Sequence, residues 1–474
     1  MSENLLREHG VKDKYLAILR EILKKKDLVL NPMQDEFVKE GFLEKDKVII
    51  QAPTASGKTL LVYLKYAINI ENGKERMIYL VPYVRIKREL LKKLGIWKKL
   101  GIIATDNYDD YDKGKAQVFV ATYASIDLSL LRGEKQTSDF LVLDEIDMVT
   151  DDLQGTRVES SIARILRESE IPALFALSAT IGSPQLTASW LDCATFTSDY
   201  RPGDLAKTIE QHSHDKKKPE IIDEVFRSSD NNEQPMMVFY YSRRRCRQNA
   251  VKLAQRRAGQ VAKTTSPSIA SAKKEIYAKC DITSEINDQI MCLNYNVAFY
   301  HGRLQPQCRE IVEKLLAASL IDVVFTTPAL ARGTNMPVRT VVIPNPFKFS
   351  PTYGNVVLSR TEVEQMFGRA CRPPFQDKGF GVVISTTDAM TERLKERVYG
   401  DLQKMSSKFL QSRRTKGRTL NQYKLAIELI KEAKMQNRAE DQLPKLFESY
   451  LFMQEIEDKE GFHKTLQDIT SKLM

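Results

Sequence analysis

Lys58 and Thr59 close a stretch of small residues, APTASGKT (52–59), whose composition suits phosphate binding. The stretch follows the apolar run KVII and leads into LLVYLKYAI, which predicts a strand, a tight turn and a helix. Backbone N–H groups at such a turn converge on an anion, the lysine adds a charge, and the threonine hydroxyl can bind a metal. The pattern indicates ATP with Mg²⁺ as ligands, although an ordinary strand–turn–helix would look the same. The candidate contacts are Ala52 (where the usual pattern has Gly), Pro53, Thr54, Ala55, Ser56, Gly57, Lys58 and Thr59.

A pair of acidic residues ends a second apolar run, FLVLDEID (140–147). Carboxylates at the end of a buried strand, beside a phosphate loop, are suited to Mg²⁺ coordination and water activation. We expect Asp144 to hold the metal through water, and Glu145 to orient and deprotonate the attacking water. The alternative is a solvated acidic turn.

Two arginines stand three residues apart in EQMFGRACRPPF (364–375). We predict that Arg369 and Arg372 lie on adjacent turns of one helix and face one target. Because a guanidinium group is always charged and bidentate, it suits the charge that spreads over a phosphoryl group in transfer. Surface arginines in salt bridges are the alternative.

Short apolar runs alternate with amphipathic stretches, first in KVIIQA, RMIYLVP, QVFVAT, FLVLDE and LFALSAT, then in MMVFYYS, NVAFYHG, DVVFTTP, TVVIPN and GVVISTT. Runs that are apolar on both faces are typical of parallel sheets covered by helices. The polar, proline-bearing stretch 202–235 reads as a boundary or connecting segment. Helical periodicity takes over from about residue 396. The sequence therefore predicts two tandem α/β domains and a small, mostly helical third unit.

Composition gives the class of protein and its charge. The chain has 474 residues, 72 Lys and Arg against 62 Asp and Glu, and a formal charge of +10, which suits a polyanion such as nucleic acid. The six cysteines form no CxxC pair, so neither a zinc ribbon nor a disulfide framework is indicated. Without an apolar run of about 18 residues or a signal-peptide core, we expect a soluble cytoplasmic protein, or a nucleoid or nuclear one if the substrate is DNA.

Taken in order, these segments resemble the motifs of the superfamily-two helicases. APTASGKT resembles their first motif, DEID the second, SAT (178–180) the third, VFYYSRRR (238–245) the fourth, TTPALARGTNMP (326–337) the fifth and QMFGRACRP the sixth. SDYRPGDL, FYHGRLQPQCREIVE and the end of the fifth motif narrow the resemblance to the superkiller-like group. This group includes exosome-associated RNA helicases and archaeal fork-repair DNA helicases. The resemblance covers roughly residues 28 to 390.

The resemblance implies roles for residues that spacing alone does not assign. Gln34, in NPMQDEFVKEG, would read adenine, while Gln365 and Gly333 would join the nucleotide site. Asp147 and Cys371 depart from the family, which usually has His and Gly at these positions. The expected contacts to one nucleic-acid strand are Pro82, Arg85, Thr122, Ser242, Arg243 and Thr327. Arg244, Arg245 and Arg247 we interpret as a solvated start of a helix.

A strand-separating hairpin is implied between the fifth and sixth motifs, in PNPFKFSPTYGNVVLSR (344–360). Phe347, Phe349 and Tyr353 would stack there on the last base pair, at about 1–3 kcal/mol per base. The alternative is that these rings pack into the core of the second domain.

The domains implied are an N-terminal helix (1–27), a RecA-like ATP-binding domain (28–203), a second RecA-like domain (204–395) and a winged-helix-like domain (396–474). Because only about eighty residues follow the strand after the sixth motif, we expect the large helical ratchet domain of the archaeal enzymes to be missing or drastically reduced. Four basic residues in the third unit are candidates for phosphate contact, or for an ordinary charged loop: Arg413, Arg414, Lys416 and Arg418.

The leading hypothesis is an ATP-dependent helicase that closes two domains on ATP and thereby moves 3′ to 5′ along single-stranded or tailed duplex nucleic acid. DNA is slightly favoured over RNA, and a monomer that binds no membrane is expected. An RNA helicase is one alternative. Another is a nucleotide-gated clamp that hydrolyses ATP without unwinding.

Overall fold

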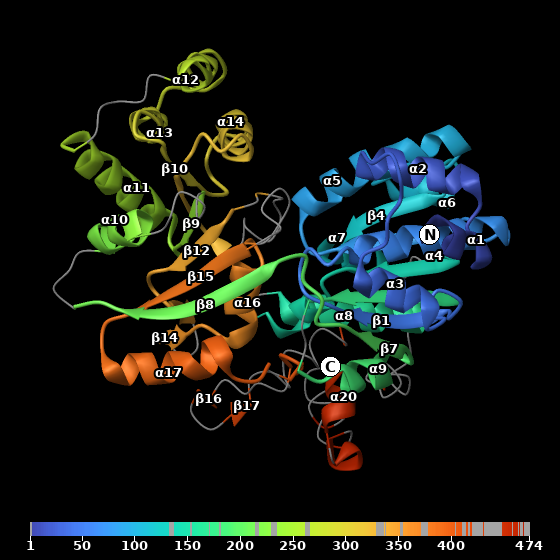
Figure 1. The fold of residues 1–474 in the computed structure, drawn as a ribbon. Coiled ribbons are helices and arrows are strands. Elements are labelled where there is room, and N and C mark those ends of the chain that lie inside the picture. Colours follow the sequence, from blue (N-terminus) through green and yellow to red (C-terminus); the bar gives the residue numbers. More distant parts are fainter. Residues whose placement is uncertain are drawn as a thin grey trace. The chain divides into compact units, whose positions relative to one another are not determined.

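The structure is a computed structural model (Figure 1). It describes residues 2–131, 137–151, 154–169, 171–179, 182–213, 218–228, 235–260, 266–328, 336, 338–350, 354–370, 378–402, 404–409, 414–415, 418–419, 430, 448–456, 458–462, 464 and 468. The chain divides into two compact units, one made of Met1–Tyr200 with Gln403–Met474 and the other of Arg201–Leu402. Each is described by itself.

The first unit is built on a seven-stranded sheet with the order β3-β4-β2-β5-β6-β1-β7, in which every neighbouring pair is parallel. The inner strands are almost completely buried because their residues are apolar on both faces. The strands are β1 Lys47–Gln51, β2 Met77–Val81, β3 Ala104–Thr105, β4 Val118–Thr122, β5 Phe140–Leu143, β6 Ala173–Ser178 and β7 Ala194–Thr197.

Helices cover this sheet and bury its apolar surface. On one side, Trp97 lies within 6.3 Å of the rings of Tyr15, Tyr63 and Tyr66, so the N-terminal helices belong to the same core as the sheet. The helical elements of the unit are α1 Ser2–Glu8, α2 Asp13–Leu23, α3 Pro32–Lys39, α4 Lys58–Glu71, α5 Val84–Leu94, η1 Gly95–Leu100, α6 Tyr108–Asp112, α7 Tyr123–Leu131, η2 Ile146–Thr150, α8 Gly155–Glu168, α9 Pro184–Leu191 and α20 Phe452–Glu455.

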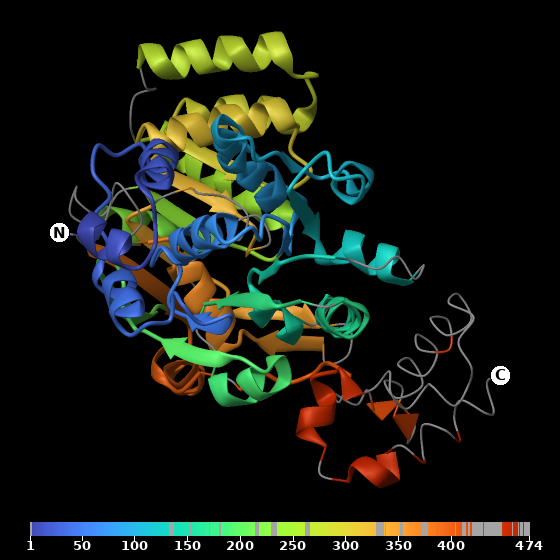
Figure 2. The ribbon, with the colours of Figure 1, turned by 90° about the vertical axis from the view of Figure 1, so that its right-hand side faces the viewer.

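The second unit repeats this architecture on a six-stranded parallel sheet with the order β10-β11-β9-β12-β15-β8. Helices α12, α13 and α14 contact one another beside β10 (Figures 1 and 2). The strands are β8 Asp204–Gln211, β9 Met236–Phe239, β10 Val297–Tyr300, β11 Val323–Thr326, β12 Thr340–Ile343 and β15 Lys378–Ser385. The helices are α10 Lys218–Ser228, α11 Arg243–Ala258, α12 Pro267–Lys279, α13 Ser284–Leu293, α14 Pro306–Ala317, α16 Arg360–Phe367 and α17 Asp388–Tyr399. The predicted pair of tandem α/β domains is confirmed.

An antiparallel hairpin leaves this second sheet after β12. Its strands are β13 Phe347–Ser350 and β14 Gly354–Val357, with Phe347 opposite Val357. A capping box at Ser359 then begins α16, because the Ser359 side chain accepts from the Glu362 amide and the Glu362 carboxylate accepts from that of Ser359.

The stretch 202–235 lies next to the division between the two compact units, after Tyr200, but it is not only a connecting segment. Residues 204–211 form β8, which pairs with β15 in parallel over eight positions, and residues 218–228 form α10. The sequence of β8 has no apolar strand pattern, because this strand lies at the edge of the sheet (Figure 1). Each residue there is only partly covered, and polar side chains are tolerated.

The placement of Arg369 on a helix is wrong. Helix α16 ends at Phe367 with Gly368 as its cap, so Arg369 lies in the following turn. The prolines at 373 and 374 disfavour a helical continuation into the second arginine.

Most of the predicted winged-helix-like unit lies outside the described residues. Two described strands of two residues each, β16 Arg414–Thr415 and β17 Arg418–Thr419, pair antiparallel there. Arg413 and Lys416 lie outside the described residues. Over the part of the chain that is described, no helix has the length and apolarity needed to cross a membrane.

Candidate functional site

The loop between β1 and α4 has the backbone shape of a phosphate-binding turn. Ala55 and Gly57 both have left-handed backbones, with φ of 66° and 91°. An alanine in this region costs about 1–2 kcal/mol. At Gly57 a Cβ would also lie 2.2 Å from Nε2 of Gln34, so a larger residue there would displace the Gln34 side chain. The loop therefore holds a strained conformation of the kind that functional sites use.

Gln34 holds this loop in place. Its Nε2 donates to the Gly57 carbonyl at 2.9 Å, and its Oε1 accepts from the backbone N–H of Asn31 at 3.1 Å. Asn31 adds a second tie, because its side-chain amide donates to the Ser56 carbonyl at 2.7 Å. The predicted adenine contact of Gln34 stays a prediction. The contact that anchors the loop was not predicted, although the sequence NPMQ is typical of the capping box that Asn31 and Gln34 form.

Two polar groups in the loop fit a triphosphate. Lys58 Nζ donates to the carbonyls of Ala52 and Pro53, at 2.5 and 2.9 Å, so its charge lies over the loop. Ser56 is completely buried, and its Oγ has no hydrogen-bond partner among the residues that the structure describes. Buried hydroxyls are normally paired, so Ser56 is a donor suited to a phosphate oxygen. The residues present fit the predicted nucleotide.

Asp144 lies at the end of β5 and is electrostatically coupled to Lys58. Burial raises the pKa of the Asp144 carboxyl to about 6, opposed first by the positive charge of Lys58 and then by the backbone N–H of Glu145. Tyr79 donates to Oδ2 of Asp144 at 3.4 Å. With Thr59 at the start of α4, the carboxylate supplies hard oxygen ligands of the kind that Mg²⁺ prefers.

Glu145 and Asp147 follow in a tight turn. Glu145 has a left-handed backbone with φ of 50° and precedes η2. Asp147 is buried, and its Oδ1 accepts from Ser178 Oγ at 3.4 Å. This hydrogen bond joins the second motif to the third. Asp147, which accepts it, is the residue at which the second motif of this chain departs from the family pattern.

The other predicted strand contacts of the first unit lie at the ends of β2 and β4. Pro82 is buried after β2, and Arg85 pairs with Glu89 at 3.3 Å within α5. Thr122 is also buried, and its hydroxyl lies 3.0 Å from that of Ser125. The Thr122 side chain therefore caps the start of α7, and its contact to nucleic acid stays a prediction.

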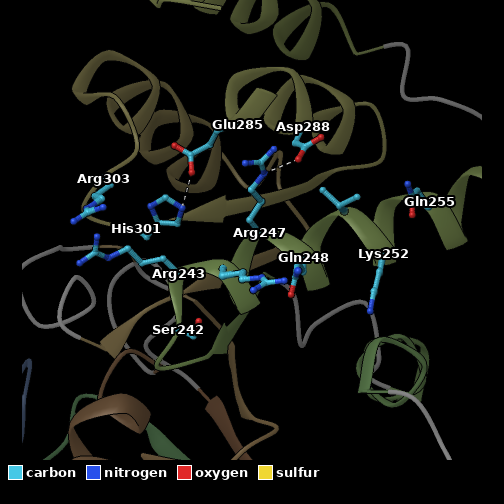
Figure 3. A pocket seen from close by; sticks show the side chains of 12 residues that line it. Ser242, Arg243, Arg247, Gln248, Lys252, Gln255, Glu285, Asp288, His301 and Arg303 are labelled. Carbon is cyan, nitrogen blue, oxygen red and sulfur yellow. Dashed lines mark hydrogen bonds and ion pairs between the residues drawn. The ribbon is translucent and has the colours of Figure 1, made fainter. Parts of the chain in front are cut away.

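In the second unit, Ser242 begins α11 by accepting from the Arg245 amide, and Arg243 is exposed. Both line a cavity of about 820 Å³, here named the His301 cavity (Figure 3). Figure 3 shows Arg243 and Arg303 near His301, at one end of this cavity. The arrangement concentrates positive charge at the start of α11.

One ion pair and one histidine–carboxylate contact, both missed from the sequence, shape this cavity. His301 Nε2 lies 3.2 Å from Oε1 of Glu285, and Arg247 Nε donates to Asp288 at 2.6 Å (Figure 3). Burial lowers the pKa of His301, which is only 2% exposed. The pairs connect α11 and β10 to α13, contacts between segments far apart in the sequence that no local pattern reveals.

The sixth motif is positioned by a buried carboxylate. Glu364 pairs with Arg201 and Arg360, at 2.8 and 2.9 Å, and also with Lys207. Burial opposes its ionisation, but the hydrogen bond from Lys207 and the three positive charges hold the pKa of Glu364 below its usual value. Arg369 is buried in the turn after α16.

The hairpin presents one of its two described aromatic rings to solvent. Phe349 is 73% exposed, whereas Phe347 is half-buried. Thr327 is buried just after β11, and Gln365 is half-buried on α16. Gly333, Tyr353 and Arg372 lie outside the described residues.

Comparison with known proteins agrees with this arrangement. Residues 31–188 match the DEAD/DEAH box helicase family, and residues 268–374 match the helicase conserved C-terminal domain. The chain therefore belongs to the superfamily-two helicases.

Similar proteins narrow the class. The chain is 28% identical to the ATP-dependent DNA helicase Hel308 of Pyrococcus horikoshii over 408 residues, which is 82% of this chain and 55% of that protein. The Hel308 proteins of Methanocella arvoryzae and Caldivirga maquilingensis are also 28% identical, over 80% and 85% of this chain and 54% and 56% of their own lengths. The predicted membership of the superkiller-like group is confirmed. The chain spans about half the length of these relatives.

Proposed function

We propose that the chain is an ATP-dependent DNA helicase, which moves 3′ to 5′ on single-stranded DNA as a monomer and opens duplexes ahead of it. The observation that carries the proposal is the geometry of the phosphate loop, where Lys58 Nζ lies over the loop carbonyls and within electrostatic reach of the half-buried Asp144 at the end of β5. The likeness to DNA helicases favours DNA over RNA as the substrate.

The residues of the loop supply binding and charge. Lys58 leaves its two carbonyl partners and donates to the phosphates, and Ser56 gains the partner that it lacks. Mg²⁺, held by Asp144 through water and by Thr59, would neutralise the charge that develops on the phosphates. Glu145 orients the attacking water and takes its proton.

The second unit supplies arginines and part of the grip on the strand. Arg369 and Arg372 stabilise the phosphoryl group in transfer, because a guanidinium group adds 10³- to 10⁵-fold, to order of magnitude, in such reactions. Ser242, Arg243 and Thr327 hold the phosphate backbone of the strand. Contacts to the backbone allow a motor to pass over any sequence.

ATP hydrolysis and strand displacement test the proposal. We expect single-stranded DNA to stimulate hydrolysis more than RNA does at one stated salt concentration. We also expect displacement from 3′-tailed duplexes but not from 5′-tailed ones. Stimulated hydrolysis without displacement of any strand would contradict the helicase and favour a nucleotide-gated clamp.

A further inference from the structure

Helix α11 contributes residues to two neighbouring cavities, which share Gln248 and Lys252. Arg243, Arg244 and Arg247 line the His301 cavity (Figure 3), whereas Arg245, Asn249 and Arg256 line a second cavity of about 860 Å³. Spacings of four and seven residues put the second set on one helix face and the first set on another. The second cavity, here named the Lys218 cavity, has its remaining walls from α10, Tyr240 and Asn345.

The Lys218 cavity has the chemistry of an anion site. Lys218 donates to the Pro344 carbonyl at 2.7 Å, and no carboxylate among the described lining residues pairs with it or with Arg245. Burial and then the charge of Arg245 lower the pKa of Lys218 to about 8. The acid in the lining, Glu220, is paired with Arg256 at 3.6 Å. Two cations held together in this way are stabilised by a bound anion.

A buried hydroxyl points to the same ligand. Tyr240 lines the Lys218 cavity and is 2% exposed, and within the described part of the chain its hydroxyl has no hydrogen-bond partner. An unpaired buried hydroxyl costs about 1–3 kcal/mol, which a ligand oxygen would recover. The cavity therefore offers two positive charges and a neutral hydrogen-bond donor to one anionic group, as a phosphodiester requires.

The hairpin cavity, of about 560 Å³, adjoins this site. It is lined by Phe347 and Phe349 of the hairpin and by Tyr241, and it shares Arg245 and Asn345 with the Lys218 cavity. Phe349 and Tyr241 are exposed, at 73% and 40%. Aromatic faces next to a phosphate site are the elements with which proteins bind single-stranded nucleic acid.

We propose that the hairpin cavity and the Lys218 cavity together bind a second single strand of nucleic acid, the one along which the motor does not move. This inference rests on the proposed helicase function. Arg243, expected on the translocated strand, lines the His301 cavity, on a different face of α11. A strand that leaves the hairpin on the side of Arg245 meets aromatic rings first and the cationic site next. The two strands would thus contact different faces of α11, with Ser242 at its start lining both the His301 cavity and the hairpin cavity.

Binding to two substrates without ATP tests the proposal. One is a 3′-tailed duplex, and the other is a fork that carries an added 5′ arm on the complementary strand. We expect the wild-type chain to bind the fork about 10-fold more tightly, as two charge-assisted contacts allow. The double variant Lys218→Ala/Arg245→Ala should lose this preference and bind the tailed duplex as the wild type does. On the fork, its salt slope should fall by about 0.7 for each phosphate that the variant no longer binds.

Two controls accompany the double variant. Arg244→Ala removes an exposed arginine of the same helix from the His301 cavity and should keep the fork preference. Lys218→Arg/Arg245→Lys keeps both positive charges and should keep most of the fork preference. Wild-type binding of the tailed duplex by the double alanine variant excludes a fold defect as the cause of its loss.

Two results would overturn the proposal. They are a fork preference that survives in Lys218→Ala/Arg245→Ala, and an equal loss of binding to both substrates in that variant. Binding of inorganic phosphate to the wild type, with no difference in affinity between the fork and the tailed duplex, would show that the Lys218 cavity is a site for free phosphate instead. A chain that binds the fork as proposed but neither hydrolyses ATP nor displaces strands would refute the helicase function separately.

Discussion

Among single residues, Gln34 makes a contact to the phosphate loop in addition to its expected contact with adenine. Its amide holds the Gly57 carbonyl and, through Asn31, the start of α3. The two roles make different predictions. A base reader discriminates between nucleotides, whereas an anchor of the loop affects every nucleotide equally.

Replacing Gln34 by Ala separates these roles. If the loop contact dominates, the KM for ATP and for GTP should both rise about 10-fold, because the strained loop loses one hydrogen bond to its backbone. Steady-state hydrolysis with both nucleotides measures this. A rise for ATP alone, with GTP unchanged, would show that Gln34 reads the base.

Replacing Glu145 by Gln should leave ATP binding intact and slow hydrolysis by about 10²- to 10⁴-fold, because the amide cannot accept the proton of the attacking water. Equilibrium binding of labelled ATP and single-turnover hydrolysis report the two steps. A variant that hydrolyses ATP at the wild-type rate would exclude Glu145 as the base.

At the scale of elements, a buried carboxylate joins the C-terminal segment to the first unit. Glu159 on α8 is fully buried and accepts from Ser407 Oγ at 2.6 Å and from the Phe452 amide at 3.1 Å. Burial raises the pKa of Glu159 from 4.5 to about 8, although both hydrogen bonds oppose the rise. The folded unit therefore binds a proton that the unfolded chain releases.

The stability of the first unit should consequently depend on pH. Since the folded pKa is the higher one, this contribution is complete below pH 4.5 and is lost as the pH rises through about 8. Glu159→Gln, which is neutral at every pH, should flatten this dependence between pH 6 and 8.5. Urea unfolding at the two pH values measures it, and an equal slope in both proteins would contradict the assignment.

We expect Glu364 to contribute to the stability of the second unit, as Glu159 does to the stability of the first. Glu364→Ala leaves Arg201, Lys207 and Arg360 without their shared carboxylate. Removing one partner of a buried ion pair costs about 3 kcal/mol or more. We expect a lower unfolding midpoint and, because α16 precedes Arg369, a lower rate of hydrolysis. Glu392→Ala, at an exposed pair with Lys395, is the control and should change neither.

Local patterns predicted most of these elements and few of the contacts between them. The inner strands of both sheets were predicted because they are apolar on both faces, and the phosphate loop and acid pair because strand ends carry them. Edge strand β8 was missed because partial exposure leaves no apolar signature. The Glu364 network and the His301–Glu285 pair were missed because their partners come from distant segments.

At the scale of the whole molecule, the proposed helicase function requires that ATP hydrolysis be coupled to strand separation at the hairpin. Phe349→Ala should lower the rate of strand displacement more than the rate of hydrolysis, because it removes an exposed stacking face worth about 1–3 kcal/mol per base. Tyr277→Ala, at an exposed aromatic residue of α12, is the matched control. An unchanged number of base pairs opened per ATP would contradict a separating role for the hairpin.

The most direct test of the central claim is DNA-stimulated ATP hydrolysis by Lys58→Ala and Arg369→Ala, measured beside ATP binding. Both units are required for hydrolysis if the first holds the triphosphate and the second supplies its arginine. We expect Lys58→Ala to lose binding and hydrolysis. Arg369→Ala should keep binding but lose about 10³-fold or more in hydrolysis. Wild-type turnover by either variant would contradict the claim.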